Sequence, residues 1–166
     1  MFSKDSYKYR AIIEFKKRTI RSYSFSLDNY NAGACGLGHN LSSDIPQGNA
    51  TYDAATANMG SPWKIPTKAQ LQELINETSY NWTSMNGAYG YKFNNITDTS
   101  KFIFLPVGGY WNDTTLNPNG PSGFYLSVSI HEKTKTWAYS LYIRYNVTPQ
   151  TSTFNRYQGL SVRAII

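Results

Sequence analysis

The segment over residues 61–76, SPWKIPTKAQLQELIN, constrains the fold more than any other part of the chain. Thr67 and Gln70 have the spacing of a capping box, in which two side chains satisfy backbone amides at the start of a helix. Apolar residues then recur at helical spacing and form one face: Leu71, Leu74 and Ile75. The pattern predicts a helix that begins after Thr67 and packs this face against a sheet.

The rest of the chain favours strands and one further helix. Fourteen Tyr, eight Phe and four Trp suit the pleated surface of a sheet. An Ala-rich helix is predicted over 51–59, ended by Gly60, because glycine is typical of the position that follows a helix. The predicted strands cover residues 9–15, 19–27, 89–93, 101–105, 124–130, 137–143 and 160–166. We therefore expect an α+β fold with two helices and a small, twisted, mainly antiparallel sheet.

Positive charge is concentrated at the N-terminus. Residues 1–26 contain seven Lys or Arg and two acidic residues, whereas the whole chain has a net charge of +6, so the body is close to neutral. A nucleic-acid-binding protein needs a basic patch on a folded face, so we expect no nucleic-acid partner. Residues 1–40 are interpreted as a basic N-terminal arm with the first strands. This arm is either part of the same unit, with a solvated surface, or an extension that docks in a virion or homo-oligomeric assembly.

Several classes of protein are excluded by simpler features. Cys35 is the single cysteine, so neither an intramolecular disulfide nor a thiolate metal cluster is available. The glycine-rich run GACGLGHN lacks the Lys-Ser/Thr of a phosphate-binding loop. Lys4 and Asp5 interrupt the N-terminus, where no apolar stretch predicts a signal peptide, and no segment has the length of a membrane span. The expected location is a virion surface or the extracellular or cell surface.

Two segments have the composition of a recognition surface. Residues 107–123 are predicted to be a long loop that carries Tyr110 and Trp111, and long loops in compact domains are usually functional. Residues 139–158 are rich in Tyr, Asn, Thr, Ser and Arg, and their last part, 147–158, is also predicted to be a loop. Tyrosine supplies rigid contact area and small polar residues supply adaptable hydrogen bonds. We expect a shallow aromatic and polar face built from 107–125 and 139–158.

Four motifs in order carry a resemblance to a known family. They are DAATANMGSPWKIPTKAQLQELI, KFIFLPVGGYW, GFYLS and the terminal GLSVRAII. Over residues 41–166 the chain resembles the Fibrobacter succinogenes major paralogous domain. The resemblance implies a C-type-lectin-like fold and a ligand-binding domain. The family includes the hypervariable proteins that diversity-generating retroelements alter in gut bacteria and their phages.

The resemblance also implies which positions contact a ligand. They are Tyr110, Trp111, Asn112, Phe124, Tyr125, Ser140, Tyr142, Arg144, Tyr145, Asn146, Asn155 and Tyr157. Tyr, Asn, Ser and Arg are residues that adenine-directed codon change generates, so the composition fits the implied variability. The chain departs from the family at Leu126, where Trp is common, and at Val128, where Ser is common. The first forty residues carry no landmark of the family.

The sequence gives little support for a metal site or a catalytic site. Trp111-Asn112-Asp113 matches a tripeptide of calcium-dependent lectins, but calcium needs six to eight oxygen ligands and few other carboxylates lie nearby in the sequence. His39 and His131 are the only imidazoles, and neither belongs to a nucleophile motif. We therefore expect no metal, no cofactor and no catalytic residue.

The glycosylation sequons and Arg163 are interpreted without a functional role. Seven Asn-X-Ser/Thr sequons occur, a number that an Asn- and Thr-rich chain produces by chance: Asn40, Asn49, Asn76, Asn81, Asn95, Asn112 and Asn146. Arg163 is predicted to pair with a buried carboxylate such as that of Asp53, with a ligand contact as the alternative.

The expected function is non-catalytic ligand binding in adhesion. The partner would be a protein or glycan receptor on a bacterial cell surface, and the setting a phage receptor-binding or fibre-tip protein. A bacterial surface adhesin is one alternative. A structural virion or assembly protein without a receptor role is the other.

Overall fold

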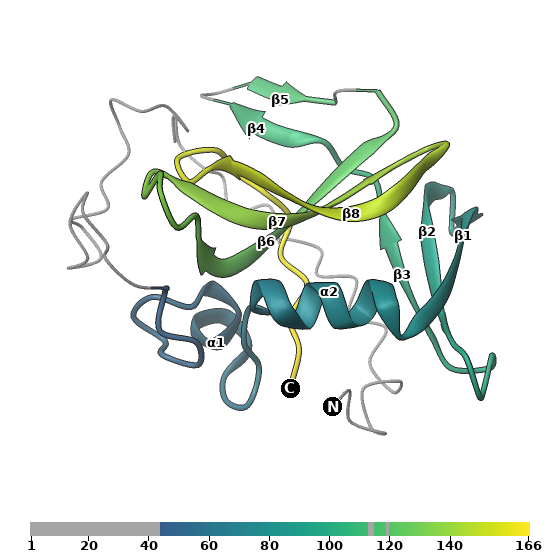
Figure 1. The fold of residues 1–166 in the computed structure, drawn as a ribbon, viewed down its shortest axis with the longest axis horizontal. Coiled ribbons are helices and arrows are strands. Elements are labelled where there is room, and N and C mark those ends of the chain that lie inside the picture. The colour runs from purple at the N-terminus through teal and green to yellow at the C-terminus, as the bar shows by residue number, and fades with distance from the viewer. Residues whose placement is uncertain (1–43, 113–114, 119) are drawn as a thin grey trace.

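A computed structural model describes residues 44–112, 115–118 and 120–166 (Figure 1). The elements are α1 (Ala54–Met59), α2 (Lys68–Asn76), β1 (Thr78–Met85), β2 (Ala88–Asn95), β3 (Phe102–Pro106), β4 (Tyr110–Asn112), β5 (Thr115–Asn117), β6 (Ser122–Ile130), β7 (Trp137–Arg144) and β8 (Val147–Asn155). The predicted α+β class is confirmed. The basic arm, Cys35, His39 and the strands predicted over 9–15 and 19–27 lie outside the described residues.

Helix α2 forms as the sequence predicts. The Thr67 hydroxyl accepts from the Gln70 amide at 3.2 Å, and the Gln70 side chain accepts from the Thr67 amide at 2.9 Å, which completes the capping box. The apolar face is buried: Leu71, Leu74 and Ile75.

Helix α1 begins three residues later than predicted, because Asp53 caps it. The Asp53 side chain is fully buried and accepts from the backbone amides of Ala55 and Thr56 at the start of the helix. Its two oxygens also accept from the amides of Gly48 and Ile65. The predicted pairing of Asp53 with Arg163 is wrong, because backbone amides occupy both oxygens. Gly60 follows the helix, as predicted, with φ of 78°.

Three antiparallel sheets replace the single sheet that was expected. They contain β1-β2-β3, β4-β5 and β6-β7-β8. In Figure 1, α2 lies below β6-β7-β8 and the β4-β5 hairpin lies above it, so the sheet has a helix face and a hairpin face. The largest core cluster lies between α2 and the two larger sheets: Leu71, Leu74, Ile75, Tyr91, Phe93, Leu105, Tyr125, Leu141 and Ile143.

Four strands form where the sequence predicted loops or nothing. The predicted loop over 147–158 is wrong for most of its length, because β8 pairs with β7 from Val147 to Asn155. The predicted loop over 107–123 contains the β4-β5 hairpin. Strand β1, with the polar sequence TSYNWTSM, was not predicted and pairs along its whole length with β2. Strand β1 accommodates polar residues because one face of it, with Ser79 and Asn81, is open to solvent.

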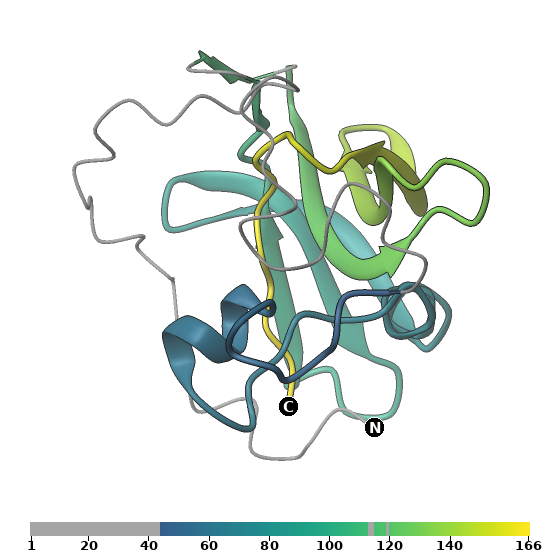
Figure 2. The ribbon, with the colours of Figure 1, turned by 90° about the vertical axis from the view of Figure 1, so that its left-hand side faces the viewer.

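The C-terminal segment is not the continuous strand predicted over 160–166. It makes isolated bridges instead, antiparallel from Gly159 to Trp111, parallel from Ser161 to Tyr125 and antiparallel from Ile165 to Lys64. Figure 2 shows this segment, in yellow, running down to the chain end beside α1. There it closes a second core cluster of Ala55, Ile65, Val128 and Ala164. The segment therefore connects the β4-β5 hairpin, β6 and the α1 region. No helix within the described residues has the length and apolar character needed to cross a membrane.

Candidate functional site

The structure divides the twelve predicted ligand-contact positions among five places. Some lie under the β4-β5 hairpin, some on its exposed edge, some at the β7-β8 turn and some at the end of β8, and Tyr125 lies in the main core. A single continuous face built from all of them is therefore not what the fold presents.

An aromatic cluster joins the hairpin to the hairpin face of the β6-β7-β8 sheet. The Tyr110 ring lies edge-on to Phe124 and Phe154, with ring centroids 5.5 and 4.7 Å apart. Phe124 in turn contacts Tyr142 at 5.1 Å and Phe154 at 4.7 Å. The Tyr110 hydroxyl accepts from the Asn117 side-chain amide at 2.9 Å. Rings packed at these distances stabilise the site, so this cluster positions the hairpin.

Three predicted contact residues are buried, and this contradicts a direct contact with a ligand. Phe124 lies inside the aromatic cluster, and Ser140 has no exposed surface. Tyr125 belongs to the main core, where its hydroxyl donates to the Pro106 carbonyl at 2.5 Å. Burial raises the pKa of Tyr125, which opposes ionisation of its hydroxyl. These residues support the site from beneath.

The exposed edge of the hairpin carries Trp111 and Asn112. The Trp111 side chain is 43% exposed, while its backbone exchanges two hydrogen bonds with Gly159, N–H to O=C, at 2.8 and 3.0 Å. The Asn112 side-chain oxygen accepts from the Gln158 amide at 3.2 Å. The hairpin strand β4 is thus paired on one side with β5 and on the other with the C-terminal segment. The Trp111 backbone is therefore fixed in position, while its ring is open to solvent.

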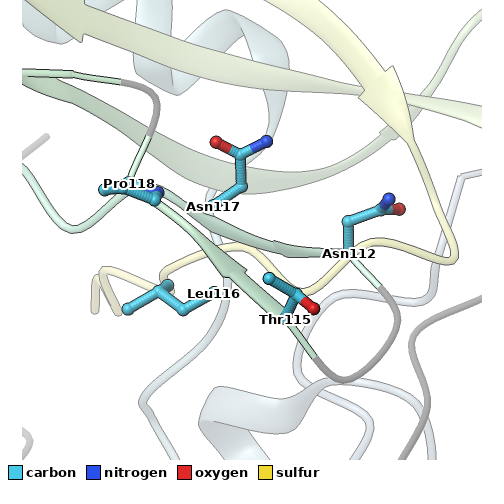
Figure 3. A pocket seen from close by; sticks show the side chains of 5 residues that line it. All are labelled: Asn112, Thr115, Leu116, Asn117 and Pro118. Atoms are coloured by element: carbon cyan, nitrogen blue, oxygen red, sulfur yellow. The ribbon is translucent and has the colours of Figure 1, made fainter.

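The same hairpin borders an open hollow of about 420 Å³. Its lining is Asn112, Thr115, Leu116, Asn117 and Pro118 (Figure 3). Leu116 pairs with Trp111 across the hairpin and is also exposed. Two amides, one hydroxyl and two apolar side chains provide hydrogen bonds and contact area in one place.

Gly109 holds the start of this hairpin in place. Its φ is 64°, and a β-carbon there would lie 2.2 Å from the Asn117 carbonyl oxygen. Only glycine therefore fits the close approach between the two strands of the hairpin.

The β7-β8 turn forms a separate exposed site. Arg144, Tyr145 and Asn146 are all exposed at this turn, and Asn146 has φ of 57°. The Tyr145 ring lies 5.5 Å from Trp82 of β1, measured between centroids. Figure 1 shows the β7-β8 turn next to the tips of β1 and β2. The predicted residues at this turn therefore face the β1-β2 hairpin.

Asn155 and Tyr157 lie at the other end of β8 and are half-buried. Thr151 bonds to Gln72 of α2 at 3.3 Å, and alternate strand residues share a face, so Asn155 belongs to the helix face. Phe154 belongs to the hairpin face. Tyr157 follows in the turn that leads to Gln158 and Gly159.

A charged cluster occupies the β6-β7 hairpin beside the start of α2. The Tyr139 hydroxyl donates to Glu132 at 2.6 Å, and the Lys68 ammonium lies 3.7 Å from the Tyr139 ring centroid and 3.7 Å from the Glu132 carboxylate. The hydrogen bond from Tyr139 is the main cause that lowers the pKa of Glu132 to about 2. The His131 imidazole accepts from the Thr134 amide at 3.0 Å. His131 thus acts as a turn residue.

Of the Trp111-Asn112-Asp113 tripeptide, only Asn112 offers a described side-chain oxygen as a calcium ligand. The Asn112 side-chain oxygen is used by Gln158, and Asp113 lies outside the described residues. Within the described part of the chain no group of three or more His, Cys, Asp or Glu is placed to hold a metal ion.

Sequence reasoning missed several residues that shape these sites: Trp82, Tyr89, Leu116, Phe154 and Gln158. One signal was available for the first two. Asn86-Gly87 is the dipeptide most typical of a two-residue hairpin, and it lies between the paired ends of β1 and β2.

Comparisons of the chain with protein-family models, with curated proteins and with solved structures find no match.

Proposed function

We propose that this chain is a non-catalytic ligand-binding protein that mediates adhesion to a receptor on a bacterial cell surface. The observation that carries the proposal is the β4-β5 hairpin. Its strand β4 is paired on both edges, the Trp111 backbone is bonded to Gly159 while the side chain is exposed, and Asn112 and the polar hollow lie on the same hairpin. An exposed indole on a backbone that is already fixed needs no ordering of the main chain on binding, so it suits an anchor residue.

The finer identity rests on the sequence motifs. We propose a C-type-lectin-like fold of the Fibrobacter succinogenes major paralogous domain type. The setting would be a phage receptor-binding or fibre-tip protein, on a virion surface or at the extracellular or cell surface. A bacterial adhesin would use the same surface. In a retroelement-diversified protein, variation would fall on exposed positions such as Trp111, Asn112 and Tyr145. The buried Phe124, Tyr125 and Ser140 would not vary.

Sequencing this locus in related isolates tests that division between positions. We expect changes to concentrate at the exposed members and to avoid the buried ones. An even spread of changes over buried and exposed positions would contradict the diversification hypothesis.

A binding assay tests the adhesive role directly. The fluorescently labelled protein is titrated onto a panel of gut-bacterial cells, and Trp111→Ala is compared with wild type. Truncating an anchor residue costs about 2 kcal/mol or more, which corresponds to a loss of affinity of roughly thirtyfold. Trp137→Ala is the matched control, because Trp137 is 40% exposed and lies at the β6-β7 hairpin. Equal binding by the Trp111 variant and wild type would remove the hairpin as the recognition element.

The alternative function is a structural virion or assembly protein that docks through the basic arm. It is favoured by the seven Lys and Arg within residues 1–26. Sedimentation of the full chain at rising concentration separates the two cases. A stable homo-oligomer without cell binding would favour assembly.

A further inference from the structure

A row of aromatic side chains runs along the inner face of β1 and β2 and ends at the protein surface. Tyr80 pairs with Phe93, and Trp82 pairs with Tyr91, so these four rings share one sheet face. Phe93 and Tyr91 are buried in the main core. Tyr89, the next member of the row, is 62% exposed. The row therefore continues an apolar core out to solvent.

The half-buried Trp82 and the exposed Tyr89 form the outer end of the row, and the exposed Tyr145 of the β7-β8 turn lies beside them. The Trp82 and Tyr89 rings are parallel to within 8°, with centroids 6.3 Å apart. The Tyr145 ring, 51% exposed, lies 5.5 Å from Trp82 at an angle of 58°. Together, Trp82, Tyr89 and Tyr145 form what we call the aromatic platform. They come from two hairpins that are remote in sequence.

Contacts beneath the aromatic platform hold its two hairpins together. The Tyr91 hydroxyl donates to the Val147 carbonyl at 2.9 Å and so ties β2 to the first residue of β8. At Gly90 a β-carbon would lie 2.1 Å from the Leu105 carbonyl oxygen, which shows how closely β2 and β3 approach beside Tyr89. Strands held in this way need no rearrangement of the main chain when a ligand binds.

Neutral polar groups surround the aromatic platform. Ser84 pairs with Tyr89, so its hydroxyl shares the face of the rings, and it is exposed. Asn86 and Asn146 form the two neighbouring turns with φ of 51° and 57°, and both are exposed. Arg144 precedes Tyr145 and is the charged residue of the β7-β8 turn. The rim consists chiefly of hydroxyl and amide groups.

We propose that the aromatic platform is a binding subsite for the hexopyranose rings of a neutral oligosaccharide. A pyranose has one apolar face, whose C–H bonds carry partial positive charge and are attracted to the negative face of an aromatic ring. Its hydroxyl groups at the rim need neutral donors and acceptors, which Ser84, Asn86 and Asn146 provide. The patch of three rings is also far smaller than a stable protein interface requires.

This inference rests on the proposed recognition function and names its ligand chemistry, but it uses the β1-β2 hairpin rather than Trp111. The two sites are distinguishable for that reason. Trp111 and Trp82 each carry an indole N–H that reports on its own surroundings.

The experiment is a titration of the full-length protein with neutral hexasaccharides of glucose, mannose, galactose and N-acetylglucosamine. The indole N–H signals of the four tryptophans are followed by NMR, and the Trp82 signal is assigned with a Trp82→Phe variant. We expect at least one oligosaccharide to shift the Trp82 signal. Tyr89→Ala should weaken that binding about threefold to tenfold, the range for one lost aromatic contact. Trp137→Ala, which removes an exposed ring elsewhere, should leave it unchanged.

Three results would overturn the proposal. The first is that no oligosaccharide shifts the Trp82 indole signal. The second is that Tyr89→Ala and wild type bind the oligosaccharide equally, and the third is that only the Trp111 signal shifts. Loss of cell binding in Tyr89→Ala without any oligosaccharide binding would assign the aromatic platform to a protein partner instead. A concentration-dependent dimer that Tyr89→Ala abolishes would assign it to a second copy. Throughout, the effect of Trp111→Ala on cell binding reports separately on the proposed function.

Discussion

Replacing Asp53 by asparagine tests how this fold joins α1 to the rest of the molecule. One carboxylate oxygen accepts from the amides of Ala55 at 2.9 Å and of Thr56 and Ile65 at 3.2 Å each. The other accepts from the amides of Gly48 and Ile65 at 3.0 Å each. An asparagine keeps one oxygen and places an NH₂ donor where the other oxygen was. Whichever orientation it takes, a donor then faces backbone donors.

The cost follows from burial. The least damaging orientation keeps the cap of α1 and turns the NH₂ group toward Gly48 and Ile65. Ile65 is 2% exposed, so its amide cannot reach water, whereas Gly48 is exposed and regains part of its hydration. The Ile65 amide keeps its 3.2 Å bond to the retained oxygen but loses the 3.0 Å bond. The new NH₂ group is a buried donor without an acceptor, which costs about 1–3 kcal/mol, and the lost bond and the donor–donor contact add to it, so we expect about 2–4 kcal/mol of lost stability. Asp53→Ala should cost more, because it also removes the cap.

Urea unfolding, followed by circular dichroism, measures this difference. With a slope of about 2 kcal/mol per molar urea, the midpoint should fall by about 1–2 M at an unchanged slope. Asn58→Ala is the control, since Asn58 is exposed on the same helix and should change stability by less than about 0.5 kcal/mol. A midpoint for Asp53→Asn within about 0.3 M of wild type would refute the reasoning, because it would mean that the carboxylate is not the acceptor that holds this region.

Three further substitutions probe other parts of the fold. Gly109→Ala should lower the thermal midpoint by at least about 4 °C, because a left-handed φ and a clash with the Asn117 carbonyl oxygen together cost about 2 kcal/mol or more, and an unchanged midpoint would contradict the geometry of the hairpin. Thr67→Ala should cost about 1 kcal/mol in urea unfolding by removing the capping hydroxyl of α2, while Thr67→Ser should retain most of the stability. The pKa of Glu132, lowered to about 2 chiefly by the Tyr139 hydroxyl, should rise toward 4.5 in Tyr139→Phe, as an NMR titration would show. Because the pKa of Glu132 is lowered in the folded state, its contribution to stability is complete above about pH 4.5 and disappears as the pH falls through 2. If the pKa of Glu132 is the same in Tyr139→Phe as in wild type, the role assigned to the Tyr139 hydroxyl is contradicted.

In the β4-β5 hairpin, neighbouring residues differ in whether they pack inside the protein or face solvent. Tyr110 and Phe124 lie in one aromatic cluster, and the next residue along the hairpin, Trp111, is open to solvent. Alternation along a strand therefore divides neighbouring residues into a supporting member and an exposed member. The same alternation explains why the predicted contact positions include buried ones.

The sequence alone determined the elements whose signals are local. The capping box at Thr67 and Gln70 depends on residues three apart, and the glycine after α1 depends on one residue's backbone freedom, so both could be read directly. Apolar runs likewise predicted β3 and most of β6 and β7. Local signals also predicted the α+β class.

Only the tertiary structure decided which residues meet. Strands β1 and β8 are polar on one face, and their pairing depends on partners elsewhere in the chain, so their own composition resembled that of loops. Asp53 found backbone amides rather than Arg163, because the chain brings Gly48 and Ile65 to its carboxylate. The residues predicted for one face were divided among five places for the same reason. The periodicity and composition of side chains predict the structure of a few neighbouring residues, whereas a surface is assembled by contacts between segments distant in sequence.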